Sequence, residues 1–270
     1  HHHRMIEIYH FWDSPCCFKV RMVLAEKEIE WTPNLIASVK FDHFHPDYQS
    51  LNPHSIVPTL VHDGRVVFQS NVIAEYLDEA FPEMRLKPEG TADRAIMRQW
   101  MHDEQAYLFP LIVTMTFNLM MTLRAKAYGM DQLQKWSKMH PDQARAQDYL
   151  KRVSSPVDQK AVDAAADKFS WHMDRLERQI SASGGPWICG KTYSLADISI
   201  APILDRIEYL DLLCVLEKLP RVSEWFDQIK AQPAFSTAAP PFDYRMWGPK
   251  KPIPEKQVSP DAPYGSFPSV

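Results

Sequence analysis

The sequence NPHSIVPTLVHDGRVVFQSNVIAEYLDEA, residues 52–80, decides the fold. Its Asp63-Gly64 pair separates two β-branched runs, 57–62 and 65–68, and a two-residue Asp-Gly connection is a strong signal for a β-hairpin. A helix is expected from Ser70 to about residue 80, because Pro82 disfavours helical backbone in the residue before it. This stretch therefore predicts an antiparallel strand pair that leads directly into a helix.

The chain before this stretch supplies the other half of a small sheet. Residues 6–11 alternate apolar and polar side chains and predict a strand. Ser14 and Pro15 are typical N-cap and first-turn residues, so a helix is expected from there to about residue 27. Residues 31–36 predict a second strand, followed by an irregular segment. The resulting order predicts an α/β domain of thioredoxin-like type with a mixed four-stranded sheet.

Beyond about Pro88 the periodic segments are helical, which predicts an all-α second domain. Helices are expected at 92–126, 158–181, 195–213 and 222–231, with a polar segment of part helix and part loop at 129–156. The tail from Pro240 is rich in proline and should be extended, because proline lacks the N–H that a helix needs. We therefore expect domains at 5–83 and 89–239 and a tail at 240–270.

Composition narrows the class of protein. Residues 1–4, His-His-His-Arg, are typical of a tag remnant, so the native chain is taken to begin at Met5. The 270 residues are 45% hydrophobic and 24% charged, as in globular proteins, and the net charge of -4 gives no reason to expect nucleic acid as a partner. No apolar run approaches the ~20 residues that a membrane span needs and no leader follows Met5, which favours a cytoplasmic protein. The four cysteines fit neither a disulfide framework nor a zinc site, so no metal is expected.

Three motifs occur in order on the expected elements. They are Asn52-Pro53-His54-Ser55-Ile56-Val57-Pro58, Gln69-Ser70 and Ser194-Leu195-Ala196-Asp197. Together they resemble the glutathione transferase superfamily, with an N-terminal domain similar to that of zeta- and theta-type members. The resemblance runs over nearly the whole chain and is weakest at 129–156 and in the tail. It implies that the first domain holds glutathione as co-substrate, that the second holds a hydrophobic electrophile, and that the protein is a homodimer.

The resemblance implies glutathione contacts on the hairpin side of the first domain. In the family the proline of the Val-Pro pair is cis, and the backbone of the residue before it, here Val57 before Pro58, pairs with the cysteinyl part of glutathione. Gln69 and Ser70 would hold the γ-glutamyl end at a helix N-terminus, although Ser70 could also be a simple N-cap. Many relatives carry Gln or Lys immediately before the Val-Pro pair, whereas this chain has Ile56, so one glutathione contact is missing or replaced.

A histidine segment is the expected site of the glycine end of glutathione. His43 lies five residues before Tyr48 in a segment similar to theta-type members, where a histidine contacts the glycine carboxylate. His45 or Lys40 could take this role, in which case His43 is a solvated loop residue.

The hydroxyl of Ser14 is the candidate activating group. A thiol with a pKa of ~8.5 is only about 3% ionised at pH 7. A charge-assisted hydrogen bond of ~1.5–3 kcal/mol and a helix N-terminus worth ~0.3–2 kcal/mol suffice to lower that pKa by ~2 units. Ser14 would then stabilise the glutathione thiolate without a separate base. The alternative is that it serves only as an N-cap.

Two other residues compete for the chemical role. Cys16 lies two positions after Ser14, and relatives with a cysteine nucleophile at this helix start form mixed disulfides with glutathione. Ser14-Pro15-Cys16 is similar to the Ser-x-Cys pattern of zeta-type members, where the serine is the activating group, and we favour Ser14. Tyr9 is a third candidate, because some classes use a tyrosine of the first strand, but it falls too far upstream.

The remaining predictions concern the helical domain. The Ser-x-x-Asp spacing of Ser194 and Asp197 predicts a reciprocal cap at a helix start, which is structural. Tyr107, Met115 and Trp247 are the expected electrophile pocket, although apolar stripes at helical spacing are more often core.

The expected activity is attack by serine-stabilised glutathione thiolate on a hydrophobic electrophile, as in detoxifying conjugation. The polar insertion, residues 193–198 and the tail are similar to bacterial β-aryl etherases, and reductive dehalogenation is an equal candidate. They are also similar to the ganglioside-induced differentiation-associated proteins. This second similarity makes a non-catalytic interaction protein of the same fold one alternative. The position of Cys16 makes a Cys16-dependent thiol transferase the other.

Overall fold

A mixed four-stranded sheet forms the N-terminal part of the chain in the computed structural model, which describes residues 5–260. Its strands are β1 (Ile6–His10), β2 (Thr32–Leu35), β3 (Thr59–His62) and β4 (Arg65–Phe68), in the order β2-β1-β3-β4. β1 pairs with β2 in parallel and with β3 antiparallel, and β3 pairs with β4 antiparallel. The predicted thioredoxin-like arrangement is confirmed. Residues 1–4, predicted as a tag remnant, and residues 261–270 of the predicted tail lie outside the described residues.

The Asp-Gly hairpin forms as predicted. Asp63 and Gly64 have φ values of 50° and 83°. Two successive positive φ angles are what a two-residue turn of type I′ requires, and its twist matches that of the strands. The turn brings Thr59 opposite Phe68, so the segment after Phe68 begins beside the loop that precedes β3.

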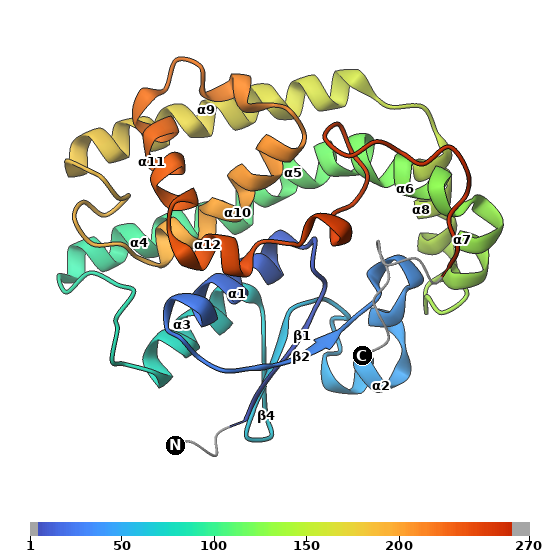
Figure 1. Ribbon diagram of the computed structural model, residues 1–270, viewed down its shortest axis with the longest axis horizontal. Coiled ribbons are helices and arrows are strands. Elements are labelled where there is room, and N and C mark those ends of the chain that lie inside the picture. The colour runs from blue at the N-terminus through green and yellow to red at the C-terminus, as the bar shows by residue number, and fades with distance from the viewer. Residues whose placement is uncertain (1–4, 261–270) are drawn as a thin grey trace.

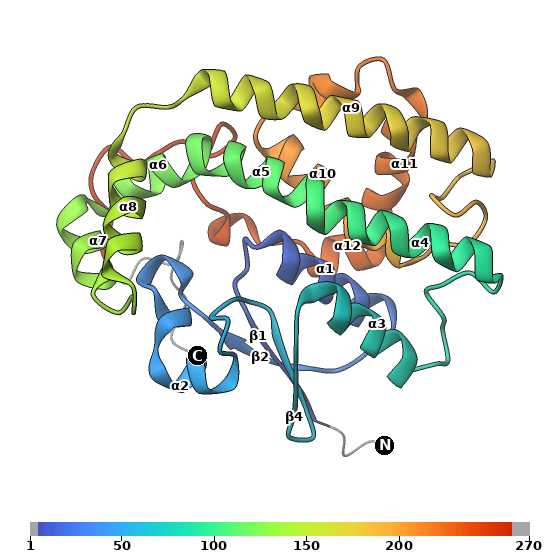
Figure 2. The same cartoon turned by 180° about the vertical axis from the view of Figure 1, so that it is seen from behind.

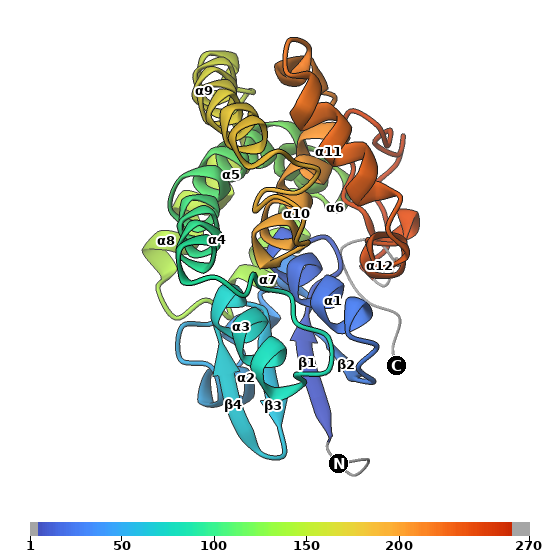
Figure 3. The same ribbon diagram turned by 90° about the vertical axis from the view of Figure 1, so that its left-hand side faces the viewer.

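Helices α1 (Pro15–Glu26) and α3 (Ser70–Ala80) lie between the sheet and the helical domain (Figures 1 and 3). Between β2 and β3 the chain forms two 3-10 turns, Ser38–Lys40 and Asp42–Phe44, and the short α2 (Pro46–Leu51). α1 packs against α3, α10 and α12, so its N-terminus lies at the boundary of the two domains.

One long helical segment opens the second domain and corresponds to the predicted helix 92–126. It consists of α4 (Thr91–Asp103), α5 (Phe109–Thr116) and α6 (Thr122–Tyr128), joined by π-helical turns at Glu104–Leu108 and Phe117–Met121. Figure 2 shows the long α9 (Gln159–Ser183) running beside α5. The polar insertion contains α7 (Met130–Ser137) and α8 (Gln143–Ser154), which fold back beside α6.

By length and composition alone, the segment Thr91–Tyr128 could cross a membrane, so the expectation that no apolar run matches a span is wrong. In the structure α5 packs against α9 and α10, the position of a core helix in the second domain.

Helix α10 (Leu195–Tyr209) is at the centre of the helical domain, and nearly all of its residues are buried. Ser194 and Asp197 form the predicted capping box at its start. The Asp197 carboxylate also accepts hydrogen bonds from the Ile188 N–H at 2.9 Å and the Trp225 indole at 2.8 Å. The cap therefore joins three separate segments, which explains why a charged residue is tolerated in the core.

The last elements are α11 (Pro220–Lys230), α12 (Pro233–Ala238) and a 3-10 turn at Phe242–Tyr244. The sequence analysis missed α12 and ended the prediction for α10 four residues late. The described part of the tail is otherwise without regular helix, as predicted, and it runs past α6 and α7 (Figure 1). The Val258 N–H donates to the Ala127 carbonyl at 2.7 Å, which fixes the tail to the end of α6.

Candidate active site

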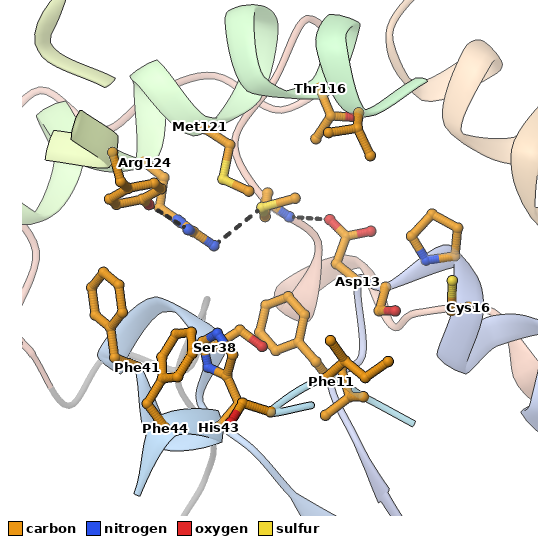
Figure 4. Close-up of a pocket in the computed structure, with 18 of the residues that line it drawn as sticks. Phe11, Asp13, Cys16, Ser38, Phe41, His43, Phe44, Thr116, Met121 and Arg124 are labelled. Carbon is orange, nitrogen blue, oxygen red and sulfur yellow. Dashed lines mark hydrogen bonds between the residues drawn. The ribbon is translucent and has the colours of Figure 1, made fainter. Parts of the chain in front are cut away.

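A cavity of about 800 Å³ lies between the two domains (Figure 4). The lining residues from Phe11 to Val57 belong to the first domain, and we call them the cavity floor. Those from Phe109 to Met246 belong to the helical domain and the tail, and we call them the cavity roof. Of the predicted site residues, Ser14, Cys16, His43 and Val57 line this cavity.

Ser14 begins α1 at the cavity floor. As the N-cap residue, its Oγ accepts a hydrogen bond from the Cys17 N–H at 3.2 Å, and Pro15 occupies the first helical position. This bond uses an acceptor site of the hydroxyl, so the O–H remains able to donate to an anion in the cavity. Ser14 can therefore cap α1 and donate a hydrogen bond to a thiolate at the same time.

An ion pair that the sequence analysis did not predict fixes the loop before Ser14. Asp13 and Arg206 are both 3% exposed, and the Arg206 Nη2 donates to the Asp13 Oδ1 at 3.0 Å and to its carbonyl at 2.8 Å. The Arg206 Nη1 donates to the Thr116 Oγ1 at 2.8 Å, and the Met246 N–H donates to the Asp13 Oδ2 at 2.7 Å. The start of α1 is thus tied to α10, α5 and the tail.

The loop before β3 positions Val57 on the floor. The Val57-Pro58 peptide bond is cis. The Tyr48 hydroxyl and the Asn52 amide both donate to the Ile56 carbonyl, and both also contact the Thr59 hydroxyl. Within the described residues the Val57 backbone has no hydrogen-bond partner. Its N–H and C=O are therefore available to an extended ligand at the cavity.

Gln69 and Ser70 stand at the start of α3 but do not line the cavity. The cap of this helix is Gln69, not Ser70: its side-chain oxygen accepts from the N–H groups of Asn71 and Val72 at 2.7 and 3.1 Å. The buried Ser70 Oγ instead accepts a hydrogen bond from the Lys19 ammonium at 3.0 Å. Lys19 forms a buried ion pair with Glu104 of the first π-helical turn.

The thiol of Cys16 is held in its neutral form. Burial raises the pKa of Cys16 to about 12, although the Lys19 charge and a hydrogen bond from Ser70 act in the opposite direction. Burial raises the pKa of Cys17 as well. A thiol nucleophile at neutral pH requires a lowered pKa, so this environment does not favour Cys16 as a nucleophile.

His43 lines the floor among aromatic rings. Its ring lies 4.3 Å from that of Phe44 and stacks with that of Phe41 at 6.2 Å between centroids. Burial, together with the charges of Arg124 and His140, lowers the pKa of His43 to about 4. The imidazole is therefore neutral at pH 7 and offers a hydrogen bond rather than a positive charge to a carboxylate.

The other candidates of the first domain lie elsewhere. His45 caps α2 by accepting the Asp47 N–H at 3.2 Å, and it lines a separate cavity with Tyr9. The Lys40 ammonium lies 5.7 Å from the ring centre of Trp136 on α7.

The three residues predicted for the electrophile pocket do not line the cavity. Tyr107 is 51% exposed and stacks on His172, whereas Met115 is fully buried in the core. Trp247 is buried against Tyr128. The apolar part of the roof is formed instead by Phe109, Ile112, Val113, Met121 and Tyr149.

Arg124 of α6 is a site residue that the sequence analysis missed. It is 4% exposed, and Figure 4 shows its guanidinium projecting into the cavity across from Phe41 and Phe44. It donates to the Tyr149 hydroxyl at 2.8 Å and to the Met246 sulfur at 3.5 Å. Among residues 5–260, no group of three or more potential metal-ligating side chains is present.

Two family descriptions match the chain: "Glutathione S-transferase, N-terminal domain" over residues 13–80 and "Glutathione S-transferase, C-terminal domain" over residues 121–233. Together with the fold, these matches show that the chain belongs to the glutathione transferase family of enzymes.

Three relatives illustrate the range of this family. Protein LigF of a Sphingobium species is 27% identical over 235 residues, which cover 85% of this chain and 91% of LigF. The crystal structure of this β-etherase superposes with a TM-score of 0.75 over 87% of this chain and 98% of its own. Maleylacetoacetate isomerase of Rattus norvegicus is 28% identical over 86% of this chain and 91% of its length. Tetrachloro-P-hydroquinone reductive dehalogenase of Sphingobium chlorophenolicum is 24% identical over 86% and 95%.

Proposed function

We propose that this enzyme activates glutathione with the Ser14 hydroxyl and transfers it to a hydrophobic electrophile in the cavity between the domains. The observation that carries the proposal is the shared lining of one cavity by the N-cap hydroxyl of α1 and the unpaired backbone of Val57. The Val57 backbone would bind the cysteinyl part of glutathione as an added strand. The sulfur of the bound glutathione would then lie beside the Ser14 O–H and the N-terminus of α1.

Other contacts with glutathione follow from the same placement. Gln69 and Ser70 at the start of α3 would hold the γ-glutamyl end through the Ser70 N–H and the Ser70 hydroxyl, because the Gln69 side chain already caps the next two N–H groups. Neutral His43 would donate to the glycine carboxylate. The apolar roof would receive the electrophile, in place of the pocket first expected at Tyr107, Met115 and Trp247.

The reaction class follows from the nucleophile. A thiolate attacks an electrophilic carbon, the carbon–sulfur bond forms, and a halide or an aryloxide leaves with the bonding electron pair. The relatives include a β-etherase and a reductive dehalogenase, so ether cleavage and dehalogenation are the candidate reactions beside detoxifying conjugation. We also propose that the enzyme is located in the cytoplasm.

The test is the pair Ser14→Ala and Cys16→Ser, assayed with glutathione and 1-chloro-2,4-dinitrobenzene. Loss of a charge-assisted hydrogen bond of ~1.5–3 kcal/mol should lower kcat/KM of Ser14→Ala by about ten- to hundredfold. Cys16→Ser should stay within about twofold of the wild type, and Ser14→Thr, which keeps the hydroxyl, should restore part of the activity. The reverse ranking, with activity lost in Cys16→Ser alone, would support the Cys16-dependent thiol transferase instead.

A calorimetric titration with glutathione separates an enzyme from a non-catalytic protein of the same fold. Binding to the wild type, together with a raised ionised fraction of the bound thiol in ultraviolet absorbance, supports the proposal. Absence of binding would contradict it.

We also propose a homodimer formed through the face seen in Figure 2, which carries β4, α3, α4 and α9. Four large apolar side chains on these elements and the adjoining π-helical turn are exposed: Val66, Val72, Tyr107 and Trp171. Burial of such side chains is a usual driving force of association. Sedimentation of the wild type and of Trp171→Glu would test this, since a monomeric wild type contradicts it.

A further inference from the structure

We infer that the cavity selects an aromatic electrophile that carries a carboxylate, an inference that rests on the proposed glutathione transfer. Part of the evidence is the charge of the cavity roof. Apart from the Asp13–Arg206 pair, the charged lining side chains are cationic at Arg124, Arg145, Lys151 and Arg152, and the lining carboxylate is Asp148. The roof is therefore positive in a protein whose net charge is -4.

The acid on the floor does not balance this charge. Asp13 already accepts hydrogen bonds from Arg206 through one carboxylate oxygen and from the Met246 N–H through the other. The Asp13–Arg206 pair is thus internally compensated. The cations of α8, Arg145, Lys151 and Arg152, line the cavity with the carboxylate of Asp148 beside them.

Arg124 gives the roof a fixed cation. It is 4% exposed, and its bonds to the Tyr149 hydroxyl and the Met246 sulfur hold the guanidinium in place. A guanidinium is planar and presents its N–H groups in a fork that matches a carboxylate. Arg152 is also held, because its guanidinium lies 4.0 Å from the centre of the Phe117 ring.

Aromatic rings complete the site. Phe11, Phe41 and Phe44 of the floor lie opposite Arg124 in Figure 4. A flat ring placed between them would direct a carboxylate on its edge toward Arg124 and the cations of α8. Exposed cations at the entrance, Arg145 and Lys151, would raise the local concentration of such an anion.

The step itself needs no further reactant. The glutathione thiol loses its proton to solvent, its sulfur bonds to the ring carbon that carries the leaving group, and that group leaves with its electron pair. Neither partner is oxidised or reduced overall.

The experiment compares two electrophiles with the same ring and leaving group, the anionic 4-chloro-3-nitrobenzoate and its neutral methyl ester, at saturating glutathione. For the wild type we expect kcat/KM for the acid to exceed that for the ester by about tenfold, although the free carboxylate activates the ring less than the ester does. The double variant Arg145→Gln/Lys151→Gln should lower this acid-to-ester ratio about fivefold or more. Both positions are exposed on α8, so the fold should be retained.

The matched control is Lys126→Gln/Lys160→Gln, which removes the same charge from exposed sites outside the cavity lining. Its ratio should equal that of the wild type. An equal fall in the control would show that net charge, not the site, sets the preference, and would overturn the inference.

The same data distinguish the two possible sources of the carboxylate. If the α8 variant raises KM for glutathione and leaves the acid-to-ester ratio unchanged, the roof recognises the glycine carboxylate of glutathione and the inference is wrong. Turnover of the ester without preference for the acid overturns this inference and leaves the proposed function intact. No turnover of either compound, together with no glutathione binding, overturns the proposed function itself.

Discussion

The floor of the cavity offers a helix cap and exposed backbone, whereas the roof offers side chains from several helices and the tail. On the floor, the groups of interest are the Ser14 hydroxyl and the N–H and C=O of Val57, which are placed by where the chain turns. On the roof, Phe109, Met121 and Arg124 are placed by how helices pack. Glutathione binding at Val57 on the floor should therefore depend on chain geometry, and electrophile binding at the roof on residue identity. The predictions below test this contrast.

The largest effect should come from the ion pair that joins the floor to the roof. Arg206→Met leaves Asp13 buried without its cation, which should lower the free energy of unfolding by about 3–5 kcal/mol. Urea denaturation would measure this loss. The exposed pair Arg98–Glu75 is the control, and Arg98→Gln should cost less than about 1 kcal/mol. Equal losses in the two variants would contradict a special role for the buried pair.

A substitution in the roof should weaken binding of the electrophile and leave binding of glutathione unchanged. Met121→Ala removes apolar contacts at ~0.8 kcal/mol per buried methylene, which should raise KM for a neutral electrophile about five- to thirtyfold. KM for glutathione, measured in the same assays, should change less than twofold. A parallel rise of both KM values would mean that floor and roof are not separable.

Part of the pH dependence of stability should originate beneath the floor, at His10, beside the contribution of His43 on the floor itself. Burial lowers the pKa of His10 from its usual 6.5 to about 2, and the Arg21 charge adds to this shift. The unfolded chain then binds a proton below pH 6.5 that the folded chain does not, so His10 makes stability fall as the pH falls. Between pH 7.5 and 5.5 the loss is about 1.4 kcal/mol.

The variant His10→Gln isolates this contribution. Its free energy of unfolding should decrease less than that of the wild type over the same pH interval, by about 1.4 kcal/mol. Urea titrations at the two pH values would give both numbers. Identical pH dependence in the two proteins would refute the assignment to His10.

The smallest effect is expected at Val57. Because the proposed contact uses its backbone, Val57→Ala should change the Kd of glutathione by less than about threefold, or less than ~0.7 kcal/mol. Calorimetry would measure the affinity, with far-ultraviolet circular dichroism as a check on folding. A loss of binding in a folded variant would show that the side chain, not the backbone, holds the ligand.

Prediction from the sequence succeeded where a feature is local. The Asp63-Gly64 turn, the Ser14-Pro15 helix start and the Ser194–Asp197 cap each depend on residues within a few positions of one another, and all three are confirmed. Turns and helix caps of this kind can be predicted from the sequence because each requires particular residue types. The fold class followed from their order.

The residues that line the roof could not be predicted from the sequence, because they depend on how helices far apart in the chain pack against one another. Asp13 and Arg206 are 193 positions apart, and nothing in the sequence pairs them. Two π-helical turns lie in the segment from α4 to α6, and each shifts the direction of the side chains that follow. The sequence analysis named Tyr107 and Met115 for the pocket from their apolar and aromatic character alone, whereas the structure brings Phe109 and Met121 to the cavity.

The path of the tail bears on how such enzymes diverge. A single residue of this segment, Met246, donates its N–H to Asp13 beside the helix start and places its sulfur against Arg124 on the roof. Exchange of the C-terminal segment between paralogues would therefore reshape the acceptor side in one genetic event, while the strands that would receive the tripeptide keep their own sequence.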